Sequence, residues 1–330
     1  MKVFVTRKVP DRGIDLLKAQ GYEVIINPED RPLGKTELIA ALTEGKYDAV
    51  LCDLDDKIDA EVLDAARAGG IKIFANYAVG FDNVDLKAAQ ERGVMVTNTP
   101  GVLTDTVAEH AFTLLLALAH RVAEADRFTR AGKYKGWEPM LFLGTDVAKK
   151  VLGIVGLGRI GSRVAHHAAR GFDMKVLYHD TKRNDAFEQA SGAEFRENAD
   201  DIFREADFIS IHVPLLPMTH HLVDARRLAL MKKTSYLINT SRGPVVDEQA
   251  LVEALRGRII RGAALDVFEH EPALTPGLAE LENVILTPHI ASATEETRQA
   301  MSELAAKNII EALEGRTPPN VIPLGNGASK

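Results

Sequence analysis

The segment VLGIVGLGRIGSRVAHH (residues 151–167) is the clearest indication of the fold, because closely spaced glycines join an apolar, strand-like run to a helical pattern. Gly156, Gly158 and Gly161 form the pattern G-x-G-x-x-G. In a βαβ unit the first glycine allows a tight turn, the second lets the backbone approach a pyrophosphate, and the third permits close packing of helix on strand. The segment therefore predicts a cofactor-binding turn, which also includes Leu157, Arg159 and Ile160.

An acid at the end of the next predicted strand supports this interpretation. Asp180 closes the run VLYHD (176–180), about 20 residues past the third glycine, where an acid binds the adenosine ribose of NAD and disfavours the 2′-phosphate of NADP. Lys182 and Arg183 follow directly and would offset part of this repulsion. The sequence therefore favours NAD(H) as the cofactor and leaves NADP(H) possible.

The same alternation of short strands and helices extends outward in both directions. Ahead of the glycine turn lie the strand candidates KVFVT, EVII, AVLC and KIFAN, with helical patterns around residues 11–20, 35–44 and 59–68. Behind it lie KVLYHD, FISIHV, SYLINT, GAALDVF and NVILTPH. Strands that alternate with helices form βαβ units and parallel sheets. The predicted fold is α/β with two doubly wound units, of which only the second carries the glycine turn.

The break between these units is predicted near residues 96–111, where the run Asn98-Thr99-Pro100-Gly101 disfavours regular structure. The helical pattern that follows, from about Thr104 to Arg121, is apolar around most of its circumference. A domain crossover or a subunit interface would cover it on more than one face. The last residues, PPNVIPLGNGASK (318–330), are expected to be frayed.

Composition narrows the class of protein. A net charge of -7 over 330 residues argues against a nucleic-acid-binding face. The single cysteine, Cys52, excludes an internal disulfide, and the longest apolar run, FTLLLALA (112–119), is too short to span a bilayer. We expect a soluble, cytoplasmic protein with no nucleic-acid or membrane partner.

Three polar residues follow three successive predicted strands, at the place where open α/β sheets bind ligands. Arg242 follows SYLINTS, Glu271 follows GAALDVF, and His289 follows NVILTP. An arginine binds carboxylates and polarises carbonyls, a protonated histidine donates to a developing alkoxide, and a carboxylate orients the imidazole. Singly, each has a structural interpretation as a turn cap, a solvated acid or a core histidine. Together they predict hydride transfer to a 2-keto acid.

The other titratable residues nearby receive structural interpretations. Glu269 and His270 are expected to be solvated neighbours of Glu271. His166-His167 and His220-His221 lack metal-ligand spacing with Cys, Asp or Glu partners, so no metal site is predicted.

Four segments resemble signature sequences of the D-isomer-specific 2-hydroxyacid dehydrogenase family: GLGRIG (156–161), NTSRGPVVDEQAL (239–251), ALDVFEHEP (264–272) and LTPHIASAT (286–294). The resemblance covers about residues 1–322. Within the family, three further segments are most similar to the glyoxylate/hydroxypyruvate reductase branch: NYAVGFDNVD (76–85), NTPGVLTDTVAE (98–109) and WEPMLFLGTD (137–146).

The resemblance implies a flavodoxin-like substrate domain, residues 1–99 plus 290–330, and a Rossmann NAD(P)-binding domain, residues 100–289. It implies that a homodimer reduces glyoxylate and hydroxypyruvate with NAD(P)H, and that Arg242, Glu271 and His289 are the catalytic residues. The backbone of Ala78, Val79 and Gly80 would bind the substrate, and Trp137 would cover the active site of the partner subunit. Further cofactor contacts would come from Thr104, Val213, Pro214, Thr219, Thr240, Ser241 and Asp266.

Other interpretations of the same sequence stay open. Another enzyme of the family, such as 3-phosphoglycerate dehydrogenase, is one alternative. A non-enzymatic, NAD-sensing corepressor is another, since such proteins share the fold and even the triad. The L-lactate and malate dehydrogenases carry the glycine fingerprint near the N-terminus, and formate dehydrogenases pair Gln with His, so both fit poorly. Turnover of a keto acid would separate an enzyme from a corepressor.

Overall fold

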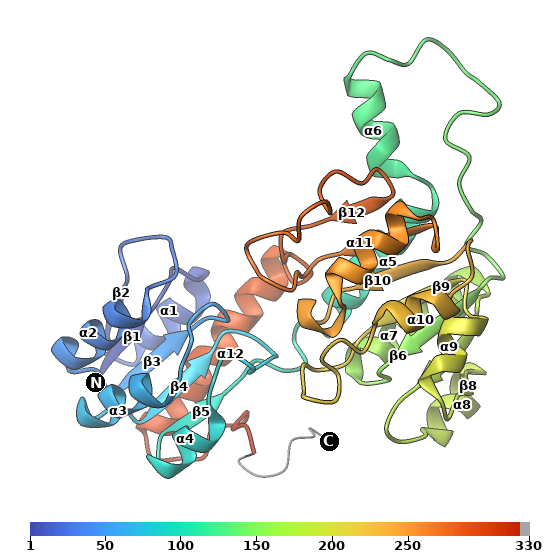
Figure 1. Ribbon diagram of the computed structural model, residues 1–330. Coiled ribbons are helices and arrows are strands. Elements are labelled where there is room, and N and C mark those ends of the chain that lie inside the picture. The colour runs from blue at the N-terminus through green and yellow to red at the C-terminus, as the bar shows by residue number, and fades with distance from the viewer. Residues whose placement is uncertain (324–330) are drawn as a thin grey trace. The chain divides into compact units, whose positions relative to one another are not determined.

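The computed structural model describes residues 1–323 and divides the chain into two compact units. Unit 1 combines Met1–Leu103 with Ala293–Lys330, and unit 2 is Thr104–Ser292. The breaks lie a few residues beyond the expected positions after residues 99 and 289. In Figure 1 each unit is a parallel sheet flanked by helices.

The sheet of unit 1 has five parallel strands in the order β2-β1-β3-β4-β5, which is the flavodoxin-like order. Every residue of β3 and β4 is buried, as expected for parallel strands that are covered by helices on both faces. The strands are β1 (Lys2–Val5), β2 (Glu23–Ile26), β3 (Ala49–Cys52), β4 (Ile73–Asn76) and β5 (Met95–Thr97). The helices are α1 (Asp11–Ala19), α2 (Lys35–Gly45), α3 (Ala60–Ala68), α4 (Leu86–Glu91) and α12 (Glu295–Leu313).

The helix α12, near the end of the chain, packs closely against α1. This packing is possible because Gly13 of α1 has no side chain. A Cβ atom at Gly13 would lie 2.2 Å from the carbonyl oxygen of Ser302. The Gly13 N–H donates to Ser302 Oγ (3.1 Å), and this hydroxyl donates to the Pro10 carbonyl (2.7 Å). The last helix therefore joins the first helix in unit 1, as Figure 1 shows.

The sheet of unit 2 has seven parallel strands in the order β12-β11-β10-β9-β6-β7-β8. The winding reverses between β6 and β9, which is the switch point at which Rossmann folds bind dinucleotides. The predicted fold class, two doubly wound parallel-sheet units, is confirmed. The strands are β6 (Val151–Val155), β7 (Lys175–His179), β8 (Glu194–Phe195), β9 (Phe208–Ile211), β10 (Tyr236–Asn239), β11 (Gly262–Leu265) and β12 (Val284–Leu286).

Seven α-helices of the described chain belong to unit 2: α5 (Thr104–Ala119), α6 (Val122–Arg130), α7 (Arg159–Phe172), α8 (Asp185–Ser191), α9 (Ala199–Glu205), α10 (Ala225–Leu230) and α11 (Glu248–Arg256). The helix predicted to reach Arg121 ends at Ala119, because Arg121 adopts a left-handed conformation (φ 55°) that a helix cannot continue. α6 buries none of its residues. Together with the chain up to residue 146 it extends beyond the rest of unit 2, and we call residues 122–146 the arm (Figure 1).

The chain after α12 is not frayed throughout, contrary to expectation. Val321 forms an antiparallel bridge with Thr97, and the Ile322 N–H donates to the Val96 carbonyl (2.9 Å). Ile322 is buried in the core beside β5, so apolar burial holds this part of the tail in place. The rest of the expected frayed segment, residues 324–330, lies outside the described residues.

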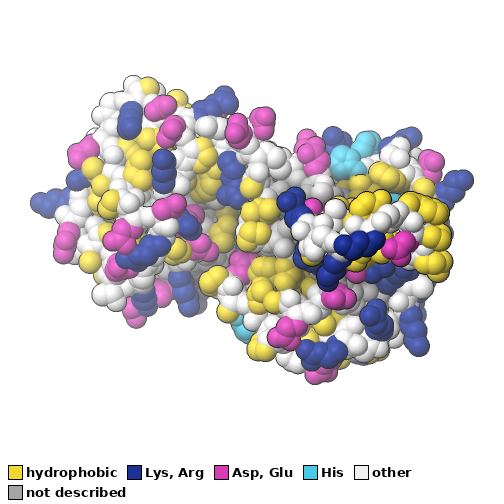
Figure 2. Space-filling view, turned by 90° about the horizontal axis from the view of Figure 1, so that it is seen from above, with side chains coloured by type: hydrophobic (Ala, Val, Ile, Leu, Met, Phe, Trp, Pro, Cys, Tyr) yellow, Lys and Arg dark blue, Asp and Glu magenta, His cyan; other side chains and the backbone are white. Residues whose placement is uncertain are grey.

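The surface shows no segregation of charge on the face seen in Figure 2, where acidic and basic side chains are interspersed. Over residues 1–323, no helix is both long enough and apolar enough to cross a membrane.

Candidate active site

The turn from β6 into α7 requires two of its three glycines for packing. Gly156 has φ +95°, and a Cβ there would lie 2.6 Å from the carbonyl oxygen of His212. A Cβ at Gly161 would lie 2.1 Å from the carbonyl oxygen of Gly156. By contrast, a Cβ at Gly158 would meet no atom within 4 Å. The turn is therefore closely packed at Gly156 and Gly161 and open beside Gly158. Gly158 lies at the N-terminus of α7, where helix N–H groups can bind phosphate.

Asp180 lies directly after β7 and contacts this turn. Its Oδ2 accepts a hydrogen bond from the Leu157 N–H (2.6 Å), which fixes the carboxylate beside the glycines. Arg183, expected to offset the charge of Asp180, instead pairs with Glu188 (2.7 Å) and Asp185 (3.0 Å) of α8. The negative charge of Asp180 is therefore less compensated than the sequence suggests.

The other predicted cofactor residues follow strand ends or begin a helix of unit 2: Thr104 at the start of α5, Val213 and Pro214 after β9, Thr219 in the same loop, Thr240 and Ser241 after β10, and Asp266 after β11. The Thr219 hydroxyl donates to the Pro214 carbonyl (2.6 Å) and accepts from the Leu216 N–H (2.8 Å), which closes this loop.

The buried Thr240 hydroxyl has no hydrogen-bond partner within the described chain. A buried hydroxyl of this kind is costly unless a ligand or water satisfies it. Together with the open space at Gly158, it fits a site that holds a dinucleotide.

The turn that presents Arg242 is closed by Asn239, which the sequence interpretation overlooked. Asn239 Oδ1 accepts from the Ser241 N–H (3.0 Å) and hydroxyl (2.8 Å), while its Nδ2 donates to the Arg242 carbonyl (2.9 Å). The Arg242 Nη1 donates to the Ser241 carbonyl (2.7 Å). A polar residue that ends the otherwise apolar strand YLIN was the only sequence signal for this role.

Gly243 brings the Arg242 turn against the turn that carries Glu271. A Cβ at this buried position would lie 1.9 Å from the backbone carbon and oxygen of Phe268. Any side chain at Gly243 would therefore push one turn away from the other, and the two predicted catalytic residues that they carry would separate.

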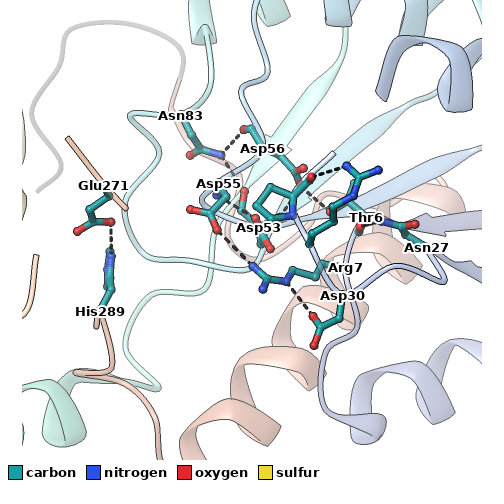
Figure 3. A network of polar contacts seen from close by, with 12 residues as sticks. Thr6, Arg7, Asn27, Asp30, Asp53, Asp55, Asp56, Asn83, Glu271 and His289 are labelled. Atoms are coloured by element: carbon teal, nitrogen blue, oxygen red, sulfur yellow. Dashed lines mark hydrogen bonds and ion pairs between the residues drawn. The ribbon is translucent and has the colours of Figure 1, made fainter. Parts of the chain in front are cut away.

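Glu271 and His289 are paired, as the dashed line in Figure 3 marks. Glu271 Oε2 lies 2.9 Å from His289 Nδ1, and Glu271 Oε1 accepts from the Phe268 N–H (2.9 Å). Because a carboxylate only accepts, Nδ1 is the donor of this pair. Both side chains are a little more than one quarter exposed, so solvent or a substrate can reach them.

Asp266 is fully buried and holds the segment around His289. Its carboxylate accepts from the Thr287 hydroxyl (2.6 Å) and from the Ile290 (2.9 Å) and Ala291 (2.8 Å) N–H groups. The His289 N–H donates to the Asp266 carbonyl (2.9 Å). The structure therefore gives Asp266 a role in placing His289, whatever contact it makes with a cofactor.

The ionisation of Asp266 is compatible with its burial. Burial acts to raise the pKa of Asp266, but hydrogen bonds from His110, Thr287 and two backbone N–H groups outweigh it and hold the pKa below the ordinary value. The charged carboxylate can then maintain the left-handed backbone of His289 (φ 52°), which costs about 1–2 kcal/mol for a residue with a Cβ.

The predicted substrate loop of unit 1 follows β4. The carbonyl oxygens of Ala78, Val79 and Gly80 accept hydrogen bonds from three donors of the same unit: Thr99 N (2.8 Å), Asn98 Nδ2 (2.7 Å) and Asn76 Nδ2 (2.9 Å). In a trans peptide the N–H points opposite to the C=O of the preceding residue. The N–H groups of Val79 and Gly80 therefore point away from these attachments.

A polar network braces this loop and the loop after β3 (Figure 3). Asn83 Nδ2 donates to the carbonyls of Asp53 (3.0 Å) and Asp56 (3.0 Å), and Asn76 Nδ2 donates to Asn83 Oδ1 (3.2 Å). The buried Asp56 carboxylate accepts from the Thr6 hydroxyl and from the Asp53 N–H (2.9 Å). Burial and the nearby charge of Asp53 raise the pKa of Asp56 to about 6, so this carboxyl keeps its proton in mildly acidic solution.

Trp137 lies on the arm, far more exposed than a tryptophan usually is, at 82% of its surface. Met140 on the same segment is 74% exposed, and Val122, Tyr134 and Leu143 are also exposed. The arm therefore presents five large apolar side chains to its surroundings.

The prediction that no acid lies beside the histidine pairs is wrong for one of them. Glu269 Oε1 lies 2.6 Å from His221 Nε2, and its Oε2 accepts from the Glu248 N–H (3.2 Å). Glu269 is therefore not a solvated neighbour of Glu271, although His270 is exposed as expected. The pairing joins segments 48 residues apart, so spacing along the sequence gave no sign of it.

Known proteins share this fold and these segments. A family model described as "D-isomer specific 2-hydroxyacid dehydrogenase, NAD binding domain" matches residues 112–291. A glyoxylate reductase of Thermococcus kodakarensis is 47% identical over 97% of this chain and 96% of the relative. Among solved structures, the TT0316 protein of Thermus thermophilus has a TM-score of 0.90 at 44% identity, covering 98% of this chain and 100% of that one.

A solved structure with bound ligands is also similar. It is an NADPH-dependent glyoxylate/hydroxypyruvate reductase of Sinorhizobium meliloti in complex with NADP and malonate, with a TM-score of 0.85 at 30% identity, covering 98% of this chain and 97% of that one. The likeness extends over both units of the present chain. The chain is an oxidoreductase with a nicotinamide dinucleotide cofactor, and it belongs to the D-isomer specific 2-hydroxyacid dehydrogenase family.

Proposed function

We propose that this protein reduces glyoxylate, and also hydroxypyruvate, to the corresponding 2-hydroxy acid with NAD(P)H. The observation that carries the proposal is the 2.9 Å pair of Glu271 Oε2 and His289 Nδ1 beside the turn of Arg242. A histidine oriented in this way is a general acid for a carbonyl oxygen. The names of the relatives from Thermococcus and Sinorhizobium support the choice of substrates.

In the proposed reaction the three residues have different tasks. The guanidinium of Arg242 binds the substrate carboxylate and polarises its carbonyl. His289 gives the proton on Nε2 to the carbonyl oxygen, while Glu271 holds Nδ1 and stabilises the charged imidazole. A nicotinamide cofactor held at the glycine turn would supply the hydride for the carbonyl carbon, so the product would be an alcohol.

Unit 1 is proposed to supply the remaining substrate contacts, and unit 2 to hold the cofactor. The N–H groups of Val79 and Gly80 are suited to a carboxylate, because their peptides are fixed through the opposite carbonyl groups. Ala78 belongs to the same loop. The glycine turn, Asp180 and the buried Thr240 hydroxyl are proposed as the principal cofactor contacts. Since such an enzyme draws on the intracellular pool of these cofactors, we propose that it works in the cytoplasm.

Steady-state kinetics test this function directly. The protein is assayed with glyoxylate, hydroxypyruvate, pyruvate and a phosphorylated 2-keto acid, each with NADH and NADPH. We expect the highest kcat/KM for glyoxylate or hydroxypyruvate. A preference for the phosphorylated acid would favour the 3-phosphoglycerate dehydrogenase alternative. Tight NADH binding without oxidation by any acid would favour the corepressor alternative.

Cofactor choice is proposed to favour NAD(H) because of Asp180. Replacing Asp180 with Asn removes the negative charge but keeps an oxygen that can accept from the Leu157 N–H. We expect the ratio of kcat/KM for NADPH to that for NADH to rise about tenfold or more, because repulsion of the 2′-phosphate is lost.

Asp180→Ala serves as the comparison, since it also removes the acceptor for Leu157. It should raise the same ratio, with lower activity for both cofactors. If neither substitution moves the ratio, Asp180 does not contact the ribose as proposed. The Sinorhizobium relative was solved in complex with NADP, so NADP(H) stays a possible cofactor beside NAD(H).

We also propose a homodimer in which the arm packs against a second copy of the chain. Large exposed apolar side chains on a projecting segment are typical of protein interfaces, and Trp137 would lie near the active site of the partner subunit. Light scattering should give a mass of about 72 kDa, twice the 36.0 kDa of the chain. Trp137→Asp with Met140→Asp should shift the mass toward the monomer, whereas Met218→Asp, at an equally exposed methionine, should not. A wild-type monomer would refute the dimer.

A further inference from the structure

Two histidines and a glutamate outside the catalytic set form a compact cluster in unit 2. The ligand atoms of His220, His221 and Glu269 all lie within 4.8 Å of one another. The histidines belong to the loop after β9, and the glutamate belongs to the turn after β11. The cluster therefore joins two loops at the same edge of the parallel sheet.

The backbone directs both imidazoles to one side of their loop. His221 is left-handed (φ 49°), and the rings of His220 and His221 lie 4.1 Å apart at 30° to each other. The adjacent pair His166-His167 on α7 has ring centroids 6.1 Å apart at 70°. A left-handed residue with a side chain is unfavourable and persists where its surroundings enforce it, often at functional sites. Here the His221 N–H donates to the Pro244 carbonyl (2.8 Å), which holds the loop.

The carboxylate of the cluster is also fixed in place. Glu269 Oε2 accepts from the Glu248 N–H (3.2 Å), and the Glu269 N–H donates back to Glu248 Oε1 (2.9 Å). Glu248 in turn accepts from the Thr275 hydroxyl (2.6 Å). This leaves Glu269 Oε1 directed at His221 Nε2, 2.6 Å away. The cluster is thus partly preorganised on its carboxylate side.

Two imidazole nitrogens and one carboxylate oxygen are a ligand set typical of zinc. Zn²⁺ binds such nitrogens and oxygens at about 2.0–2.2 Å and accepts three protein ligands with water in the fourth position. Mg²⁺ and Ca²⁺ prefer oxygen ligands only. Tetrahedral ligands at those distances lie roughly 3.4 Å apart. Occupancy therefore needs Glu269 and His221 to separate by less than about 1 Å, and the exposed ring of His220 to turn inward.

We propose that His220, His221 and Glu269 bind one Zn²⁺ ion, which links the loop after β9 to the turn that carries Glu271. The proposal does not depend on which keto acid the protein reduces. An ion that binds the folded chain stabilises it, and here it does so by joining two loops that border the catalytic residues.

The test uses the full-length protein after treatment with a chelator. Calorimetric titration with ZnCl₂ should show one ion per chain, and Co²⁺ should give the intense visible absorption of a four-coordinate site. Zn²⁺ should raise the melting temperature, whereas Mg²⁺ should not. His220→Ala, at an exposed position where folding is not at risk, and Glu269→Gln should each weaken Zn²⁺ binding at least tenfold.

The matched control is His166→Ala. It removes an exposed histidine from the adjacent pair His166-His167 on α7, which is not part of the cluster. It should leave the affinity unchanged. Absence of stoichiometric binding to the wild type would overturn the proposal. So would binding that survives both His220→Ala and Glu269→Gln, because the ion would then be held by scattered surface histidines.

Discussion

Replacing His289 with asparagine is expected to lower kcat by about 1,000- to 10,000-fold, the upper range for loss of a general acid. Asparagine cannot supply a proton to the carbonyl oxygen. It is the best replacement at this position because His289 has a left-handed backbone (φ 52°), which asparagine tolerates better than most residues. The hydrogen bonds of Asp266 to the flanking residues Thr287 and Ile290 should therefore survive.

Steady-state measurements of NADH oxidation give the loss of kcat, and fluorescence titration gives the affinity for NADH. Affinity should be unchanged, because the glycine turn follows β6 and Asp180 follows β7, whereas His289 follows β12. His270→Asn is the matched control: this exposed histidine is adjacent to Glu271 and has no proposed task. Normal turnover in His289→Asn, or an equal loss of kcat in His270→Asn, would show that His289 is not the general acid.

Much of the fold was predictable because its signals are local. Gly156 and Gly161 stand where any Cβ would collide with backbone, so the motif is a direct consequence of packing. The strands β3 and β4 are buried on both faces, and continuous apolar runs in the sequence show this. Residues that follow parallel strands lie at the same edge of a sheet. For this reason the sequence predicted that Arg242, Glu271 and His289 form one site.

The supporting residues of the site were not predictable, because their roles depend on contacts between distant segments. Gly243 supports the site because Phe268 lies against it, and Asp266 positions His289 because the chain returns to it at Thr287. Glu269 appeared solvated for the same reason, since its partner His221 is 48 residues away. A sequence pattern reports spacing along one element, whereas these contacts are set by how two loops pack.

The end of α5 shows a different limit. The helical pattern in the sequence extends to about Arg121, yet the helix ends at Ala119, Arg121 is left-handed and the arm begins. Arg121 is held there by its own pair with Glu124 (2.6 Å) of α6. Periodicity predicts which face of a helix is apolar, but the position of its last residue depends on such local contacts.

Replacing Arg242 with glutamine is expected to lower kcat/KM for the keto acid about 1,000-fold. Glutamine loses the positive charge and the paired N–H groups that bind a carboxylate at two points, and charged hydrogen bonds are worth about 1.5–3 kcal/mol each. KM should rise and kcat should fall, because the guanidinium is proposed to hold the carboxylate and to polarise the carbonyl.

Arg242→Lys should fall between glutamine and the wild type, since lysine keeps the charge but binds at a single point. The turn itself should persist in both variants, because Asn239 holds it through the backbone carbonyl of residue 242 and not through the side chain. Arg256→Gln, at an exposed arginine of α11, is the control for loss of a charge from unit 2 and should leave kcat/KM unchanged. If Arg242→Gln raised the KM for NADH and spared that for the keto acid, Arg242 would contact the cofactor, and another cation would have to bind the substrate carboxylate.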